Sequence, residues 1–395
     1  MTGNAAVAGA LDGLTVIDAS RVLGGPYCGQ ILADHGARVI KIEPPQGDET
    51  RHWGPPFHGD AASYFIGLNR NKHGIALDFS TEDGRAVLLA LLERADVFIE
   101  NFKTGTLEKW GMGRDALRER FPSLVHCRVS GFGEDGPYGG RPGYDAAIQA
   151  QVGLMSVNGA PDGKPTRMGI PVVDMVTGLN AAVGVLLALQ ERARSGAGQF
   201  VEAALYDCGV SLLHPHLPNY YLGGGLPKLA GNAHPNITPY DTYACKDGDL
   251  FLAVGNNGQF AKLCDALGIP EAKADPRYAT NALRKEHRPE LREALEAQLS
   301  AWPVQEVSEK LVTSGVPCAP VRTIDQVVDD PHTHARGMIV DLPDGYRGTA
   351  SPIKLERTPA TYRKSPPSFA GDTDAIAEEY GLTEGRLAAA FIRKD

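Results

Sequence analysis

Short apolar runs alternate with helical patterns along residues 14–129, and this alternation limits the possible folds more than any other feature of the sequence. The first part reads as a strand (LTVIDAS, 14–20), a helix and a second strand (RVIKIEPP, 38–45) that two prolines end. Further strands are predicted over 75–79, 97–100 and 124–129, and helices over 81–94 and 104–119. The alternation predicts an α/β fold built on a parallel sheet that helices cover.

The rest of the chain predicts a second, smaller domain. A helix is expected over 175–194, a strand in QFVEAAL and a helix over 206–222, before a Gly- and Pro-rich stretch at 223–239. Helices follow over 259–267, 288–302 and 304–314, then a short strand (338–342) and a last helix (384–393). We therefore divide the chain into a large domain (1–222), a linker (223–239), a small α+β domain (240–325) and a C-terminal segment (326–395).

Composition argues against several classes of protein. The net charge of −9 disfavours a surface that binds nucleic acid, because such surfaces are usually basic. No charge-free apolar run reaches about 18 residues, so we predict no membrane span. The first residues lack the pattern of a secretory signal. The six cysteines stand singly, which is typical of reduced thiols, and we expect a cytoplasmic protein.

The common cofactor and metal motifs are missing from the sequence. The turn after the first strand reads ASRVLGGPYCGQ and lacks the G-x-G-x-x-G of dinucleotide-binding units. There is no P-loop, no H-E-x-x-H and no cluster of His or Cys with metal-ligand spacing. We therefore expect no metal and no tightly bound cofactor.

Polar and aromatic residues gather in three loops beside predicted strands. NRNK (69–72) precedes one strand, ENFKTGTLEKWG (100–111) follows another, and GFGEDGPY (131–138) follows a third. Each loop alone could be an exposed polar turn. Because loops at the ends of parallel strands line the ligand crevice, the three together predict an elongated ligand across the sheet edge.

One carboxylate, Asp174, stands between an apolar extended run and a long helical pattern (MGIPVVDMVTGLN). An aspartate just before a helix is a favoured N-cap, which contributes about 1 kcal/mol. The same position would also place the acid beside free backbone N–H groups, which can stabilise negative charge on an attacked carbonyl. The two roles are compatible, and the local pattern leaves both open.

A glycine-bearing loop, GNNG (255–258), connects a predicted strand to a predicted helix. The loop could be a plain turn. It could instead be a mobile cover over an active site, because Gly255 and Gly258 permit backbone angles that other residues avoid.

Taken together, these stretches resemble the class III CoA-transferases, the formyl-CoA and carnitine type. The resemblance runs the length of the chain and rests on LDGLTVIDASRVLGGP, GARVIKIEPPQGDETR, LNRNK, ADVFIENFKTGTLEKWG, GFGEDGPY, GYDA, VVDMVTG, GNAHPNITPY and GNNGQF. It implies a Rossmann-like large domain that the C-terminal segment completes, together with a smaller domain. It also implies a homodimer of two interlocked, ring-like chains.

The resemblance assigns roles to individual residues. It implies that Asp174 is the catalytic acid and that a CoA thioester is a substrate. The positions it implies for CoA contact are Val22, Leu23, Gly24, Leu68, Asn69, Arg70, Asn71, Lys72, Asn101, Phe102, Lys109 and Phe132. Leu23 and Phe132 stand where formyl-CoA enzymes carry a glutamine and a tyrosine, so oxalate is not the expected acceptor.

Racemases of acyl-CoA esters share this fold, and they carry a histidine before the aspartate of a G-H-D motif. This chain has Tyr144 at that place, in GYDA. A phenol with a pKa of about 10 is a poor proton shuttle at neutral pH, which favours CoA transfer over racemisation. A racemase with another base, and a CoA-binding protein without activity, stay open as alternatives.

Within the family the chain looks closest to succinyl-CoA-dependent enzymes that act on dicarboxylates, through GDETRHWGPPFHGDAASYF and GNNGQFAKLCDALGIPE. A dicarboxylate needs a cationic partner for its remote carboxylate. Candidate partners, each of which could also be an ordinary surface charge, are Arg51, His52, Arg167 and His234, and Tyr144, Gly255 and Gly258 complete the expected substrate site. We predict CoA transfer from succinyl-CoA to a small dicarboxylic acid through an aspartyl anhydride and an aspartyl-CoA thioester.

Overall fold

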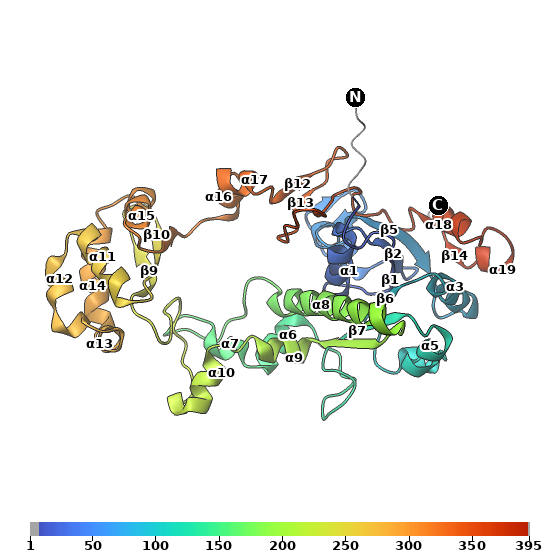
Figure 1. The fold of residues 1–395 in the computed structure, drawn as a ribbon, viewed down its shortest axis with the longest axis horizontal. Helices are drawn as coiled ribbons and strands as arrows, with labels where there is room; N and C mark the ends of the chain where they lie inside the picture. The colour runs from blue at the N-terminus through green and yellow to red at the C-terminus, as the bar shows by residue number, and fades with distance from the viewer. Residues whose placement is uncertain (1–7, 394–395) are drawn as a thin grey trace. The chain divides into compact units, whose positions relative to one another are not determined.

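The computed structural model describes residues 8–393, and the chain forms two compact units (Figure 1). The large unit contains 8–154, 168–218 and 332–393, and the small unit contains 155–167 and 219–331. The division made from the sequence has other boundaries. Residues 155–167, 219–222 and 326–331 belong to the small unit, and the Gly- and Pro-rich stretch at 223–239 lies inside that unit.

A seven-stranded sheet forms the centre of the large unit (Figure 1). Its order is β14-β5-β2-β1-β6-β7-β8, and every neighbouring pair is parallel except β14 with β5. The strands are β1 (Thr15–Asp18), β2 (Arg38–Glu43), β5 (Lys72–Leu77), β6 (Val97–Glu100), β7 (Val125–Ser130), β8 (Phe200–Ala204) and β14 (Phe391–Ile392). The predicted α/β fold with a parallel sheet is confirmed.

Helices cover both faces of this sheet. The longer ones are α1 (Gly24–Asp34), α3 (Glu82–Leu92), α5 (Arg114–Arg120), α6 (Asp145–Gln151), α8 (Val172–Ser195), α9 (Leu205–Ser211) and α18 (Thr373–Glu379). Successive strand residues point to opposite faces, so Val16 packs with α1 and α8 whereas Ile17 packs with α3 and α18. Both faces are therefore closed, and the loops at the strand ends form the accessible edge.

Shorter elements complete the large unit. They are the 3₁₀ turn η1 (Glu49–His52), the hairpin β3 (Phe57–His58) and β4 (Ala61–Ala62), α2 (Ser63–Ile66), α4 (Thr106–Lys109), the hairpin β12 (Ile339–Asp341) and β13 (Arg347–Thr349), and α19 (Gly385–Ala388). Three short helices lie where the chain passes from one unit to the other: α7 (Leu154–Val157), α10 (His216–Asn219) and α17 (Pro331–Ala335).

Three helices predicted from the sequence are wrong in extent. The helix expected over 104–119 is interrupted between α4 and α5, because Gly111 takes a left-handed conformation with φ 70°. The helix expected over 206–222 is interrupted between α9 and α10, where Pro215 removes a backbone donor. The last predicted helix, 384–393, ends early because Phe391 is buried and pairs with β5 as an antiparallel edge strand.

The small unit has its own core and an antiparallel sheet of order β11-β10-β9. Its strands are β9 (Tyr240–Ala244), β10 (Asp249–Ala253) and β11 (Cys318–Pro320), and its helical segments are the π-helical turn η2 (Tyr220–Gly224), α11 (Asn257–Leu267), α12 (Pro270–Ala274), η3 (Pro276–Tyr278), α13 (Asn281–Glu286), α14 (Arg288–Leu299), α15 (Val304–Thr313) and α16 (Ile324–Val328). Helices α11, α14 and α15 match the three predicted for this region within three residues at each end.

One helix among the described residues, α8, is long and apolar enough to cross a membrane by length and composition alone. Its uncharged stretch, 175–190, is shorter than the run of about 18 residues applied to the sequence. Val173, Ala181 and Val185 of α8 are fully buried against the sheet, which is the packing of a core helix.

Candidate active site

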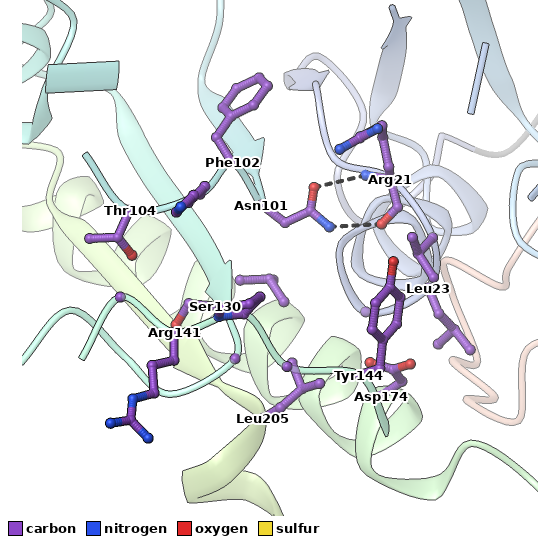
Figure 2. A pocket seen from close by; sticks show the side chains of 18 of the residues that line it. Arg21, Leu23, Asn101, Phe102, Thr104, Ser130, Arg141, Tyr144, Asp174 and Leu205 are labelled. Carbon is purple, nitrogen blue, oxygen red and sulfur yellow. Dashed lines mark hydrogen bonds between the residues drawn. The ribbon is translucent and has the colours of Figure 1, made fainter. Parts of the chain in front are cut away.

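A cavity of about 250 Å³ opens at the carboxyl ends of β1, β6 and β7 in the large unit (Figure 2). Its lining comes from the loops after these strands, from the loop before α6 and from the first turn of α8. The lining residues are Arg21, Val22, Leu23, Gly24, Glu49, Asn101, Phe102, Lys103, Thr104, Val129, Ser130, Gly131, Gly140, Arg141, Pro142, Gly143, Tyr144, Asp174 and Leu205. Ligand crevices of parallel sheets lie at this edge.

Asp174 stands inside the first turn of α8 and not before it. The N-cap position belongs to Pro171, and α8 begins at Val172, so the predicted N-cap role of Asp174 is wrong. The run before Asp174, expected to be extended, is an irregular turn that ends at Pro171. Proline at this place has no side-chain acceptor, so the helix must find its cap elsewhere.

The cap of α8 comes from Asp145, in the first turn of α6. Its Oδ2 accepts hydrogen bonds from the backbone N–H of Val173 (2.8 Å) and of Asp174 (3.2 Å). The other early N–H groups of α8, those of Val172 and Met175, donate to backbone carbonyls. The expectation that free N–H groups of this helix face the reaction is therefore wrong, because each already has an acceptor.

The side chain of Asp174 is buried without a cation. It is 8 % exposed, and no Lys, Arg or His of the described residues forms an ion pair with it. Burial, and in second place the negative charge of Asp145, raise the pKa of Asp174 to about 7. Asp174 and Tyr144 both line the cavity, and Figure 2 draws them at the same end of it. An acid held this way is a basic, poorly solvated carboxylate, which suits a nucleophile.

The start of α1 faces Asp174 across a very short distance. A Cβ added to Gly24 would lie 3.6 Å from the backbone oxygen of Asp174, an ordinary van der Waals contact. A Cβ added to Gly178 of α8 would lie only 2.6 Å from the backbone oxygen of Gly24, so this close approach of the two helices requires glycine at position 178. The N-cap residue of α1, Leu23, makes no side-chain capping bond. The N-terminus of α1 therefore borders the cavity with its positive end and without a capping side chain.

Hydrogen bonds from the Asn101 side chain fix the backbone of the loop at residues 21–24. Asn101 accepts a hydrogen bond from the N–H of Arg21 (2.9 Å) and donates one to its carbonyl oxygen (2.8 Å), as Figure 2 shows. Val22 takes a left-handed backbone conformation (φ 71°), which costs energy for a β-branched residue. Asn101 thus lies in the cavity wall, and its amide supports the loop.

Five of the twelve residues that the sequence suggested for CoA contact line this cavity together with Asp174. They are Val22, Leu23, Gly24, Asn101 and Phe102, and Tyr144 joins them from the predicted substrate residues. Lys109 is exposed at the end of α4, and Phe132 packs its ring on Tyr138 and Tyr206. Neither of these two borders the cavity.

The NRNK loop and Leu68 do not line the cavity. The polar side chains of the loop form hydrogen bonds with other residues of this chain. Lys72 donates to Asp18 (2.9 Å) and Asn69, and Arg70 forms a double hydrogen bond with Asp34. Asn71 binds backbone groups of the C-terminal segment at 361–364. None of these residues lines the cavity, because the loop enters β5 at its amino end whereas the cavity opens at carboxyl ends. The CoA contact expected of them stays a prediction.

The cations suggested for the remote carboxylate do not line the cavity either. Arg51 is 3 % exposed and forms a double hydrogen bond with the buried Glu43, at 2.7 Å from each oxygen. His52 is exposed at the end of η1, and Arg167 and His234 belong to the small unit. Sequence position alone could not separate a buried ion pair from a free cation.

Gly255 and Gly258 also belong to the small unit, and neither takes a left-handed conformation. Asn256 caps α11 by accepting from the N–H of Gln259 (2.9 Å), and the Gln259 side chain accepts from Gly255 (2.8 Å). The buried Arg284 donates to Asn257 (3.0 Å). The expectation of unusual backbone angles is wrong, because this loop is a hydrogen-bonded helix start.

Three cations in the cavity wall escaped the sequence prediction: Arg21, Lys103 and Arg141. None of the three forms an ion pair with an acid of the described residues, and Arg141 stacks over Tyr138 at 4.7 Å. A usable signal existed, since each lies in a loop after a predicted strand. Within residues 8–393 no group of three His, Cys, Asp or Glu side chains is arranged to hold a metal ion.

Comparison with known proteins gives one consistent result. The family model described as CoA-transferase family III matches residues 11–373. A succinate–glutarate CoA-transferase of Agrobacterium fabrum is 42% identical over 91% of this chain and 92% of that protein. A succinyl-CoA:mesaconate CoA-transferase of Haloarcula hispanica is 37% identical over 94% of each chain.

A solved structure shares the architecture as well as the sequence. The crystal structure of a CAIB/BAIF family protein from Brucella suis is 42% identical, with a TM-score of 0.86 over 94% of this chain and 100% of that one. The family match, the two relatives and this structure extend over almost the whole chain. The chain therefore belongs to CoA-transferase family III, and it is a CoA-transferase.

Proposed function

We propose that this enzyme moves CoA from succinyl-CoA to a dicarboxylic acid, with Asp174 as the nucleophile. The observation that carries the proposal is the buried carboxylate of Asp174, which has no cation and lies at the end of the cavity. Relatives named for glutarate and mesaconate, with 42% and 37% identity, support the choice of succinyl-CoA and a dicarboxylate. A buried acid without a cation is costly, so a role in the reaction is a reason for it to be there.

The reaction proceeds by exchange of acyl groups between carboxylates. Ionised Asp174 attacks the thioester carbonyl of succinyl-CoA, the C–S bond breaks, and CoA leaves as a thiolate from a succinyl–aspartyl anhydride. The thiolate then attacks the aspartyl carbonyl, which releases succinate and forms an aspartyl-CoA thioester. The acceptor carboxylate repeats the sequence in reverse: it forms a second anhydride, the thiolate attacks its acyl carbon, and Asp174 is restored.

Negative charge develops on a carbonyl oxygen at each of these steps. Because the first N–H groups of α8 already have acceptors, donors for this oxygen have to come from another element. The uncapped start of α1, with Leu23 and Gly24 in the cavity wall, is the nearest source. A helix N-terminus in a partly enclosed site suits this task.

Anionic parts of CoA would bind at the other end of the cavity. Arg21, Phe102 and Lys103 all line the cavity, and Figure 2 shows Arg21 and Phe102 at the end away from Asp174. Arg21 and Lys103 would meet phosphate groups, and Phe102 would meet a flat or apolar part of the cofactor. The thioester then reaches Asp174 along the wall formed by Leu23 and Tyr144.

The interlocked homodimer and a cytoplasmic location belong to the same proposal. Apolar side chains crowd the π-helical turn and the stretch after it, where Tyr221, Leu222 and Leu226 are 75 %, 88 % and 81 % exposed. So much exposed apolar surface in one segment is typical of a surface that another chain covers. Light scattering coupled to size exclusion, at micromolar protein, should give a dimer mass near twice 42.1 kDa.

The direct test supplies succinyl-CoA with a panel of dicarboxylates and monocarboxylates, and follows new acyl-CoA by chromatography. Glutarate- or mesaconate-sized acids should be converted, and Asp174→Asn should lower the rate by at least about a thousand-fold. The matched control is Asp115→Asn, an exposed first-turn acid on α5, which should keep wild-type activity. Conversion of monocarboxylates alone would contradict the dicarboxylate assignment.

A second experiment separates CoA transfer from racemisation and from simple CoA binding. Borohydride or hydroxylamine added during turnover should trap a modified Asp174 peptide, which mass spectrometry identifies. A racemase would instead exchange the α-proton of a 2-methylacyl-CoA with deuterated solvent. A protein that only binds CoA would do neither.

A further inference from the structure

The nucleophile does not stand alone at the start of α8, because a second buried carboxylate touches its backbone. Asp145 is 8 % exposed, as Asp174 is, and it also lacks an ion-pair partner among the described residues. Two neighbouring acids buried without a cation repel each other and lose hydration, so the arrangement disfavours folding. A contact that opposes stability and lies at the reacting group calls for a functional explanation.

Asp145 is fixed firmly in place by hydrogen bonds. Its Oδ1 accepts from the side chain of Gln149, at 2.5 Å, one turn later on α6. Gln149 is itself fully buried, and its oxygen accepts from the N–H of Met168 (2.9 Å), just before α8. The other oxygen, Oδ2, takes the N–H groups of Val173 and Asp174. This carboxylate therefore spans two helices and holds the backbone of the nucleophile.

We propose that Asp145 is a positioning residue for the transfer reaction: it caps α8 through the backbone of Asp174 and keeps the Asp174 carboxylate basic enough to attack a thioester. The inference rests on the proposed role of Asp174 as nucleophile. Without Asp145 the N–H groups of the first turn would face Asp174 and stabilise its charge, which would weaken it as a nucleophile. Asp145 occupies those groups and adds a like charge.

Other titratable groups near Asp174 do not supply the same effect. Tyr64, on α2, interacts with both carboxylates, and burial followed by these charges raises its own pKa to about 12, so it stays neutral. The titratable groups of the cavity wall are Arg21, Glu49, Lys103, Arg141 and Tyr144, and α1 brings Tyr27 against Gly178 of α8. Among all of these, Asp145 is the charged group whose field reaches Asp174 most strongly.

The test compares Asp145→Asn with Asp145→Glu. Asparagine keeps an oxygen for the two N–H groups but removes the charge, whereas glutamate keeps the charge. In the pH profile of kcat/KM, measured with succinyl-CoA and an accepted dicarboxylate, Asp145→Asn should move the acidic limb down by about one pH unit or more. Its kcat at pH 8.5 should fall about three-fold or more, because a less basic carboxylate attacks more slowly. Asp145→Glu should keep the limb near its wild-type position.

A merely structural cap would lower stability in both variants and leave the limb where it is, and that result would overturn the proposal. A second measurement does not depend on activity. Melting temperatures at pH 5 and pH 8.5 are compared for the wild type, Asp174→Asn, Asp145→Asn and the double variant. The pH-dependent gain from Asp174→Asn should shrink when Asp145 is already neutral, and an unchanged gain would also overturn the inference.

The two measurements keep this inference separate from the proposed function. If the wild type transfers no CoA while the melting temperatures show the expected coupling, the proposed function fails and the link between the two acids stands. If the wild type transfers CoA and the limb does not move, the role of Asp145 fails and the function stands.

Discussion

Charge is buried in two different ways in the large unit. Six buried side chains form three ion pairs, and all six are at most 3 % exposed. The pairs are Asp18 with Lys72 (2.9 Å), Lys41 with Asp48 (3.0 Å) and Glu43 with Arg51 (2.7 Å). At the start of α8, by contrast, Asp145 and Asp174 are buried side by side with no cation. A carboxylate held by a cation is stabilised and unreactive, whereas Asp174, buried beside another acid and without a cation, stays basic.

One of these ion pairs, Lys41 with Asp48, stabilises the loop that leads into the cavity wall. Lys41 donates to the carbonyl oxygen of Ser20 (2.9 Å), and Asp48 lies 3.4 Å from the N–H of Val22. These contacts hold the left-handed backbone of Val22 in the cavity wall. Removing one member leaves an uncompensated buried charge, which is more costly than losing the whole pair. A neutral substitution in an ion pair should therefore lower the free energy of unfolding, whereas a neutral substitution of Asp174 should raise it.

The largest effect is expected for Arg51→Met. This change leaves Glu43 buried without its cation, so the free energy of unfolding should fall by about 3–5 kcal/mol. Urea denaturation at pH 7.5 measures the loss. Because Arg51 does not line the cavity, the KM for the dicarboxylate should stay unchanged for folded protein. A raised KM without a loss of stability would indicate that Arg51 contacts the substrate and does not mainly stabilise Glu43.

The next effect has the opposite sign. The pKa of Asp174 is raised, so the folded state holds its proton more strongly than the unfolded chain, and stability falls as the pH rises from about 4 to about 7. Asp174→Asn carries no such charge and should be more stable than wild type at pH 8 by up to about 4 kcal/mol. Thermal unfolding should show the two proteins converging at pH 4. A variant less stable than wild type at pH 8 would contradict this account.

A smaller effect appears in catalysis. Attack requires the ionised acid, so kcat/KM should lose about ten-fold for each pH unit below about 7. Rates from pH 5 to pH 8.5 give the profile, and circular dichroism at each pH controls for unfolding. A loss of kcat/KM that begins only near pH 4, where an ordinary carboxyl titrates, would show that Asp174 is solvated in the free enzyme.

The parallel sheet, and the place of Asp174 near the start of a long helix, could be read from the sequence, because both depend on local patterns. The contact between Asp145 and Asp174 could not, since it joins residues 29 positions apart through two helix starts. The Arg51 and Glu43 pair escaped for a related reason: the sequence shows a charge and a strand but not which way the side chains turn. Only tertiary packing decides whether a buried charge has a partner.

The NRNK loop lies away from the cavity, and the order of the predicted strands could have indicated this. It precedes β5, and in a parallel sheet the start of a strand lies at the edge opposite to the ligand crevice. The loops after β1 and β6 obey that rule and do line the cavity. Edge strand β14 was beyond reach, because its two residues continue a helical pattern and become a strand only by pairing with β5.

The smallest effect should come from an exposed pair, which completes the comparison. Arg118 and Asp115 on α5 lie 2.9 Å apart, as close as the buried pairs, but their side chains are 67 % and 74 % exposed. Water solvates both partners when the pair is broken, so Arg118→Met should change the free energy of unfolding by less than about 1 kcal/mol. Added salt should shrink even that change. Urea denaturation alongside Arg51→Met gives the contrast, and equal losses would show that burial does not govern the cost of an unpaired charge in this protein.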